Sequence, residues 1–327
     1  MALSVKTSSQ LVSALKSVSG GEEIALADGI YDMPTISVTP RSEVRIIGGK
    51  NAKVITKTAW NDGLQRCKNL TFDGIGVGNC VVQGGTDIKF LKTAHSGQLR
   101  FRGPCIRPVV NWAAFSGFSQ RGISFDGRAN GNYRIEDPLV ANSTFSNLGD
   151  DPILIAGVRG GVISRNSFSN IKSYRPEATD EANKIRQHAD GIQILDALPF
   201  NNRMLTIEAN KFSGIEWQAI IIQREGHSYG WADTGLYVIV TNNIFDRIGS
   251  SYVGVPTEFK AGGAAVMLSA CDQIDLFNNT ATQTQAAGLF IHGVESDDPN
   301  YSGRMGLRAA GNSWSVYNPK RIPITVP

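Results

Sequence analysis

The densest run of residues that could carry chemistry reads Lys184-Ile-Arg186-Gln-His188-Ala-Asp190-Gly-Ile-Gln193. An imidazole such as that of His188 titrates near neutral pH, so it can accept or donate a proton during a reaction. The Asp190 carboxylate follows two residues later, and we expect His188 and Asp190 to face solvent. Gln193 can hydrogen-bond hydroxyl groups. The run predicts an acid–base site centred on His188 and Asp190, with Lys184 and Arg186 as further catalytic candidates.

A second acidic position aligns with this run. Asp151 precedes Ile153 as Asp190 precedes Ile192, so we expect the two carboxylates to lie side by side. Close carboxylates split their pKa values or bind a cation. A calcium ion near Asp150, Asp151 and Asp190 is therefore an option, and no other cofactor is predicted. The structural alternative is that these aspartates only hydrogen-bond turn amides, and that His188 is a structural residue.

An internal repeat in the sequence indicates the kind of structure that positions these residues. Val162-Ile-Ser-Arg-Asn166-Ser-Phe168 returns as Thr206-Ile-Glu-Ala-Asn210-Lys-Phe212 and again around Asn243 and Phe245. Each copy alternates apolar and polar residues, as a strand does, and the copies recur at 33 to 44 residues, a spacing typical of solenoids. The aligned asparagines are Asn166, Asn210, Asn243, Asn279 and Asn312.

These repeats predict an all-β chain, a right-handed parallel β-helix that spans residues 1–327 as one domain. Asparagines at one turn of successive rungs can hydrogen-bond one another, and the phenylalanines that follow can stack inside. An antiparallel sandwich is the alternative, but tight hairpin signals do not separate the copies.

A second class of strand lies between the copies, and the apolar residues at every second position are expected to face the core. These inward residues are Ile153, Ile155, Ile192, Ile194, Ile220, Ile222, Val266, Leu268, Leu289 and Ile291. The residues between them are expected to point outward in two columns. One column is Leu154, Gln193, Ile221, Met267 and Phe290, and the other is Ala156, Leu195, Gln223, Ser269 and His292.

Residues 8–18 predict a helix, because Leu11, Val12 and Leu15 recur at helical spacing and Gly20-Gly21 follows. The open end of a solenoid exposes core side chains and strand edges, which a cap must cover. We expect the helix to cover the first rung with these three residues turned inward.

Long irregular segments adjoin the second class of strands at 172–187, 196–202, 223–234, 246–262 and 294–303. Insertions gathered on one face of a solenoid usually mark its binding face. We expect these loops to flank a groove over the face that bears Gln193 and Gln223. His95 and His227 are interpreted as loop residues without a fixed partner.

Composition excludes several classes of protein. The 32 basic and 29 acidic residues leave a formal net charge of +3 without a basic block, so no nucleic-acid partner is expected. Cys67, Cys80, Cys105 and Cys271 form no CxxC pair, which predicts small buried hydrophobes rather than a zinc site. No membrane span and no signal peptide are visible.

The phrase Gln10-Leu11-Val-Ser-Ala-Leu15, followed by Gly20-Gly-Glu-Glu-Ile-Ala-Leu-Ala-Asp28-Gly29-Ile-Tyr31, resembles the N-terminal cap and first rung of the pectate-lyase-like β-helix superfamily. It is most similar to alginate lyases and chondroitinase B, and phage tailspikes share the fold. The run from His188 to Gln193 resembles a segment of β-helix proteins that act on polysaccharides. The catalytic Lys and Arg motifs of alginate lyases are absent, so their chemistry does not carry over.

The resemblance implies a protein that binds and cleaves an extracellular or capsular polysaccharide, as a phage depolymerase does. A lyase would neutralise a uronate with Lys184, Arg186 or Arg224 and use His188 as the base. A hydrolase would use two carboxylic acids, about 5 Å apart in a retaining enzyme and farther apart in an inverting one. The candidate acids are Asp150, Asp151, Asp190 and Glu225, and the sequence leaves both reactions open.

Two further functions remain open. One is a carbohydrate-binding or virion-structural protein without turnover, and the other is an epimerase or esterase on the same scaffold. The predicted substrate-binding residues are Gln193, Gln218, Gln223, Glu225, His227 and Trp231. The expected location is extracellular or on a virion released by lysis, and the tailspike resemblance implies a homotrimer as one assembly.

Overall fold

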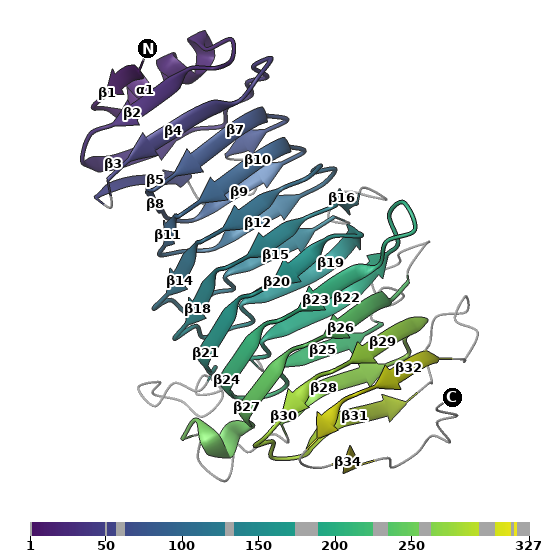
Figure 1. Ribbon diagram of the computed structural model, residues 1–327. Coiled ribbons are helices and arrows are strands. Elements are labelled where there is room, and N and C mark those ends of the chain that lie inside the picture. The colour runs from purple at the N-terminus through teal and green to yellow at the C-terminus, as the bar shows by residue number, and fades with distance from the viewer. Residues whose placement is uncertain are drawn as a thin grey trace.

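The computed structural model describes residues 2–49, 51–56, 63–127, 134–173, 189–224, 235–254, 263–293, 305–314 and 317–318. Within these ranges the strands stack into an elongated solenoid that runs from the N-terminal to the C-terminal end (Figure 1). Neighbouring strands in its three sheets pair in parallel, so the predicted parallel β-helix is confirmed and the antiparallel alternative is wrong.

Successive rungs add one strand to each of three sheets in turn. Sheet 1 contains β1 (Ala2–Val5), β2 (Glu23–Leu26), β4 (Val44–Gly48), β7 (Lys68–Asp73), β10 (Thr86–Leu91), β13 (Val109–Asn111), β17 (Leu139–Ala141), β20 (Val162–Ser164), β23 (Leu205–Glu208), β26 (Tyr237–Thr241), β29 (Gln273–Phe277) and β32 (Gly306–Ala310). Sheet 2 contains β3 (Gly29–Met33), β5 (Ala52–Thr56), β8 (Gly76–Val77), β11 (Ala94–His95), β14 (Ala114–Ser116), β18 (Thr144–Ser146), β21 (Ser167–Ile171), β24 (Lys211–Ile215), β27 (Ile244–Ile248), β30 (Thr280–Ala281) and β33 (Ser313–Trp314). Sheet 3 contains β6 (Leu64–Gln65), β9 (Cys80–Gln83), β12 (Leu99–Arg102), β15 (Ile123–Asp126), β16 (Ile135–Glu136), β19 (Ile153–Arg159), β22 (Ile192–Leu198), β25 (Ile220–Gln223), β28 (Ala264–Ser269), β31 (Ala287–Gly293) and β34 (Tyr317–Asn318).

An asparagine ladder crosses the corner between sheets 1 and 2. It consists of Asn166, Asn210, Asn243, Asn279 and Asn312. The backbone N–H and the side-chain Nδ2 of each of the first four donate to Oδ1 of the next, at 2.9–3.0 Å. Each Nδ2 also donates to a backbone carbonyl, as Asn210 does to Ile163 at 2.9 Å. The predicted column is confirmed, and its buried amides are satisfied.

An aromatic column runs inside the solenoid next to this ladder. Its rings are Phe115, Phe145, Phe168, Phe212 and Phe245, with successive centroids 4.8, 4.9, 4.5 and 5.1 Å apart. The predicted inner stack is therefore confirmed, and it begins earlier in the chain than the repeat that predicted it.

His95 extends the aromatic column, so its interpretation as a loop residue is wrong. Strand β11 aligns it with Phe115, and the two rings stack at 4.0 Å. Its Nε2 lies 2.9 Å from Thr93 Oγ1. Burial lowers the pKa of His95 to about 3, because the interior disfavours the charged imidazolium.

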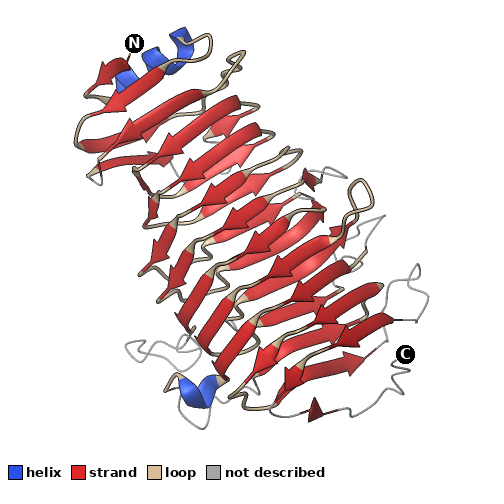
Figure 2. Ribbon diagram, in the orientation of Figure 1, coloured by secondary structure: helices blue, strands red, loops and turns tan. Residues whose placement is uncertain are grey.

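The N-terminal cap is helix α1 (Ser8–Ser17), which lies at the end of the solenoid (Figure 2). The Thr7 side chain accepts the N–H of Gln10 and so caps its first turn. Leu11 and Leu15 are fully buried and Val12 packs partly against the core, as predicted. A short 3-10 turn, η2 (Ser250–Tyr252), follows β27. In the part of the chain that the structure describes, no helix has the length and apolar character to cross a membrane.

The four cysteines are buried, as predicted, and no disulfide joins them. Burial raises the pKa of the Cys105 thiol to about 11 and that of Cys80 to about 12. Thiols held neutral in this way are inert toward metals and oxidants, so their role here is packing.

Candidate functional site

Sheet 3 presents the face on which the site was predicted, and the residues expected to face the core along its strands do so. All ten residues that were predicted to face the core are at most 7% exposed. The first outward column is also in register, from Leu154 through Gln193 and Ile221 to Met267 and Phe290.

The second outward column is partly wrong. Ala156 pairs with Asp196 rather than Leu195, and Ser269 pairs with Gly293 rather than His292, because bulges shift the register. An extra residue in one strand moves every later side chain along by one position. A simple alternation of inward and outward residues could not show this shift.

The outer face of sheet 3 is polar over its early strands. Gln83, Arg102 and Asp126 align across β9, β12 and β15, and Arg100 forms an ion pair with Asp126. Arg102 is 6% exposed. Its pKa is lowered, mainly by burial and then by the charge of Arg100. The buried Oε1 of Gln83 finds no hydrogen-bond donor among the described residues.

This arrangement places two guanidinium groups and the Asp126 carboxylate on the same face. Arginine is well suited to bind carboxylates, because its planar fork can donate two parallel hydrogen bonds. The early strands of sheet 3 can therefore attract an anionic group of a ligand. Sequence reasoning missed Arg100, Arg102 and Asp126. The signal was present in the alternation of Leu99-Arg100-Phe101-Arg102, but the strand class was traced only from Asp151 onward.

The same face becomes apolar farther along the solenoid. Leu154, Ala156 and Leu195 form a small buried cluster outside the main core, each 5–7% exposed. Ile221, on the next strand, is 4% exposed. Gln193 points outward among these residues as predicted, but it is 7% exposed rather than open to solvent.

The corner between sheets 2 and 3 holds the predicted carboxylate pair. Asp151 Oδ1 accepts the N–H of Asp190 at 3.0 Å, and Asp190 Oδ1 accepts the N–H of Gln218 at 2.9 Å. We call Asp151 and Asp190 the aspartate ladder. Their proximity is confirmed. The expectation that Asp190 faces solvent is wrong, since it is fully buried and Asp151 is 2% exposed.

The surroundings of the aspartate ladder favour an uncharged Asp151. Burial raises the pKa of the Asp151 carboxyl well above its usual value, and the charges of Asp190 and Asp150 raise it further. Arg121 opposes this shift, with its Nε 3.7 Å from Asp151 Oδ2 and 3.5 Å from Asp150 Oδ1. A raised pKa widens the pH range over which a carboxyl group holds a proton that it can donate as a general acid.

Arg224 is engaged in a structural contact. Its guanidinium forms an ion pair with Asp272 and donates to the carbonyl of Ala270 at 3.2 Å, and its side chain is 2% exposed. Asp272 also accepts the N–H of Leu236 at 2.8 Å. Gln218 is 6% exposed at the corner, and Gln223 is half-buried in register with Ser269.

Several predicted residues lie outside the described residues. They are Lys184, Arg186, His188, Glu225, His227 and Trp231. Most of the predicted loops 172–187 and 223–234, all of 294–303 and the part of 246–262 that follows residue 254 lie outside them as well. Among the described residues, no three His, Cys, Asp or Glu side chains are grouped so that they could hold a metal ion. A calcium ion near Asp150, Asp151 and Asp190 stays a prediction.

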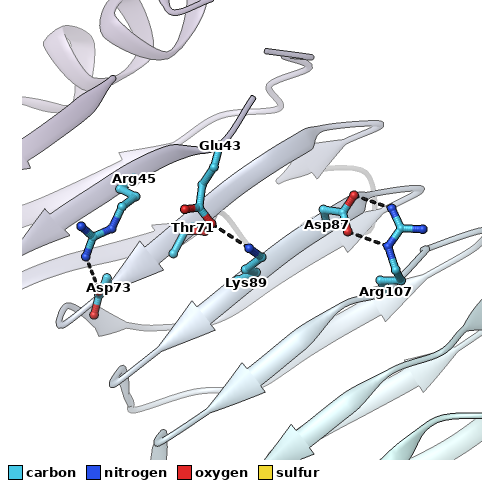
Figure 3. A network of polar contacts seen from close by, with 7 residues as sticks. All are labelled: Glu43, Arg45, Thr71, Asp73, Asp87, Lys89 and Arg107. Atoms are coloured by element: carbon cyan, nitrogen blue, oxygen red, sulfur yellow. Dashed lines mark hydrogen bonds and ion pairs between the residues drawn. The ribbon is translucent and has the colours of Figure 1, made fainter. Parts of the chain in front are cut away.

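Charged residues on the outer face of sheet 1 form pairs between rungs (Figure 3). Lys89 Nζ lies 2.7 Å from Glu43 Oε1, and Arg45 Nη2 lies 2.6 Å from Asp73 Oδ2. The hydrogen bond from Lys89 is the largest cause that lowers the pKa of the Glu43 carboxyl. In these pairs each cation meets a carboxylate of another rung.

Residues 110–298 match the protein family described as "Right handed beta helix region". No curated protein matches the sequence significantly. Among solved structures, the chain is similar to the alginate lyase from Paenibacillus sp. str. FPU-7, with a TM-score of 0.50 and 14% identity over 95% of this chain and 99% of that chain. It is also similar to a double mutant of the tailspike protein of E. coli bacteriophage HK620, with a TM-score of 0.51 and 10% identity over 93% of this chain and 62% of that chain. At these identities the likeness shows a common fold.

Proposed function

The chain belongs to the right-handed β-helix family, and on this basis we propose that it binds an extracellular or capsular polysaccharide along sheet 3 and cleaves it there. The fold is shared by an alginate lyase and a phage tailspike, which supports this class of ligand. A protein with this function would work outside a cell or on a virion, and a trimer is the assembly we propose to test by light scattering.

The observation that carries the proposal is the buried aspartate ladder. Asp151 and Asp190 lie at the start of two adjacent strands of sheet 3 and place two carboxyl groups in one buried corner. Ionisable groups with strongly shifted pKa values gather at catalytic sites, because catalysis needs a proton held or released near neutral pH. In the proposed reaction Asp151 supplies a proton, and His188, two residues before Asp190, is the proposed base.

A second observation concerns the charge of the polymer. Arg100 and Arg102 project from one strand of sheet 3, in the same stretch of its outer face as Asp126. Guanidinium groups on this face favour a polysaccharide with anionic groups. Lys184 and Arg186 remain candidates to neutralise a uronate during a lyase reaction, whereas Arg224 is already engaged with Asp272.

The alternative function is binding without turnover. Each ladder aspartate uses its Oδ1 to accept a backbone N–H, which is what a turn-stabilising residue does. This hydrogen bonding favours a receptor-binding or virion-structural protein, in which sheet 3 holds the polymer but no bond is broken.

The test is to incubate the protein with alginate, chondroitin sulfate and purified bacterial capsule, and to follow both reducing ends and the ultraviolet absorbance of unsaturated products. Only a lyase produces that absorbance. Asp151→Asn and Asp190→Asn are expected to lower turnover by about 100-fold or more, the usual size of an acid–base contribution. Asp137→Asn is the matched control, because Asp137 is half-buried in a surface pair with Arg203.

Full turnover in both ladder variants would rule out catalysis by the aspartate ladder. If the wild-type protein cleaves none of these polymers, binding decides between the remaining functions. Loss of binding in Arg100→Ala or Gln193→Ala, with unchanged melting temperature, would support the non-catalytic function on sheet 3.

A further inference from the structure

One exposed tryptophan lies away from sheet 3, at the corner between sheets 1 and 2. Each rung from β7 to β32 places one residue there in the left-handed region of backbone conformation. These residues are Gly74, Lys92, Trp112, Asn142, Arg165, Ala209, Asn242, Asn278 and Gly311. Trp112 has a φ of 56°. Its N–H donates to the Ala141 carbonyl at 3.1 Å, as Lys92 N–H donates to Asn111.

The fold does not account for a tryptophan at this position. Glycine and asparagine adopt left-handed backbone at low cost, and they occupy five of the nine positions. A bulky side chain there is a true outlier. Packing does not compensate, because Trp112 is 61% exposed. The position therefore bears a large aromatic ring that serves neither the turn nor the core.

The groups around the ring are polar and ordered by hydrogen bonds. Asn142, on the next rung, donates through Nδ2 to Asn111 Oδ1 at 2.9 Å. Arg165, one rung farther, donates through Nε to Asn142 Oδ1 at 3.1 Å. Lys92 is exposed on the preceding rung, and Ala114, two residues after Trp112, is too small to cover the ring.

We propose that Trp112 is a second carbohydrate-binding site, at which a sugar ring stacks on the indole and its hydroxyl groups contact Lys92 and Asn142. A sugar ring presents an apolar face with a polar edge, which matches one exposed aromatic ring framed by hydrogen-bonding groups. This inference rests on the proposed function for the nature of the polymer, but it assigns a site separate from sheet 3.

A protein partner fits this surface less well, because such an interface needs a wide apolar patch. The other exposed large hydrophobic residues in the described ranges are Leu3, Ile30, Ile244 and Tyr252. Ile244 lies four strands along sheet 2 from Ala114, which is roughly 19 Å at the usual strand spacing of about 4.8 Å. Trp112 therefore stands alone among polar neighbours.

A second contact of this kind would tether a long polymer and leave short oligomers unaffected, since only a long chain can span two sites. The test is native affinity electrophoresis in gels that contain alginate, chondroitin sulfate or dextran. Trp112→Asn is the informative variant, because asparagine suits the left-handed turn. It is expected to weaken retardation by the preferred polymer about tenfold, the upper range for an aromatic stacking contact, while the melting temperature stays equal or rises.

Trp112→Tyr should restore most of the retardation, and Ile244→Thr should behave as wild type because Ile244 is remote and exposed. Unchanged retardation of Trp112→Asn in a polymer that binds the wild-type protein would overturn the proposal, as would a wild-type protein that none of the three polymers retards. Loss of binding in Arg100→Ala but not in Trp112→Asn overturns the second site alone. Loss in Trp112→Asn but not in Arg100→Ala supports this site and counts against the proposed function of sheet 3.

Discussion

Two ladders join the rungs of this solenoid, one neutral and one acidic. In the asparagine ladder each Oδ1 accepts hydrogen bonds from the preceding rung, and each Nδ2 donates to the next rung or to a carbonyl. In the aspartate ladder the Oδ1 of Asp151 accepts the N–H of Asp190, and that of Asp190 accepts the N–H of Gln218. The aspartate ladder and the first four asparagines are buried, but only an asparagine side chain can both donate and accept without taking up a proton.

The use of aspartate rather than asparagine at positions 151 and 190 does not increase the stability of the fold. An asparagine at position 151 could accept the same N–H without charge, as the asparagine ladder demonstrates five times. Two buried carboxyl groups instead lose hydration and repel one another. Local arrangements that oppose stability while a neutral substitute exists are expected at functional sites. The comparison thus supports the proposed catalytic role of Asp151 and Asp190.

The largest effect is expected when the neutral ladder is interrupted. Asn243→Ala removes the acceptor for two donors of Asn210 and the donor to the Ile207 carbonyl. Each buried polar group left without a partner costs about 1–3 kcal/mol, so we expect the free energy of unfolding to fall by about 3–5 kcal/mol. Urea denaturation measures this loss.

The control is Asn242→Gly, at the neighbouring exposed position, where φ is 55°. Glycine adopts this backbone freely, so the change in the free energy of unfolding should stay within about 0.5 kcal/mol. Equal losses in the two variants would mean that the ladder hydrogen bonds add nothing beyond the turn itself, and the comparison of the ladders would fail.

A smaller effect of opposite sign is expected in the acidic ladder. Asp151→Asn is neutral at every pH, so the native state needs neither a buried charge nor the uptake of a proton at this position, and the protein should be stabilised at pH 7 by about 1 kcal/mol, or roughly 2 °C in Tm. The pKa of Asp151 is raised above its unfolded value near 3.8, so the native state binds this proton at higher pH than the unfolded chain does. Wild-type stability should therefore rise relative to Asp151→Asn as pH falls from neutral toward 4.

His95 titrates in the opposite direction and must be separated from this effect. Its pKa is lowered from 6.5 to about 3, so the unfolded chain binds the proton first and stability is lost between about pH 6.5 and 3. His95→Phe removes this titration and fits the aromatic column beside Phe115. The comparison is therefore made between His95→Phe and the double variant His95→Phe/Asp151→Asn. If the difference in their free energies of unfolding does not change as pH falls, the raised pKa of Asp151 is contradicted.

Sequence reasoning reached the asparagine ladder because its signal is periodic. Identical residues recur at the same turn, and the phenylalanine two positions later marks the inward face. The column that continues toward the N-terminus was missed, because Thr93, Ala113 and Ser143 replace asparagine there. His95 was misread for the same reason, since no repeat aligned it with Phe115.

The candidate site was harder to predict because its features depend on burial. Spacing placed Asp151 and Asp190 side by side, but a sequence does not show whether a corner is covered. The bulges in β22 and β31 leave no mark in the alternation of residues. Arg100 and Arg102 become informative only when β12 is known to lie on sheet 3 between β9 and β15.

The smallest effect is expected for a carboxylate that also joins two rungs but stands in solvent. Asp87 binds Arg107 through two hydrogen bonds, at 2.8 and 2.5 Å (Figure 3), with the Arg107 side chain 55% exposed. Water screens such a pair, so Arg107→Gln should change the free energy of unfolding by less than about 0.5 kcal/mol. The difference from wild type should vanish in 1 M salt, whereas the effect of Asp151→Asn, which lies in a buried corner, should persist. A loss of about 2 kcal/mol or more in Arg107→Gln would show that charge between rungs stabilises this solenoid even when exposed. Stabilisation by charges between rungs would then be enough to explain the aspartate ladder, without a catalytic role.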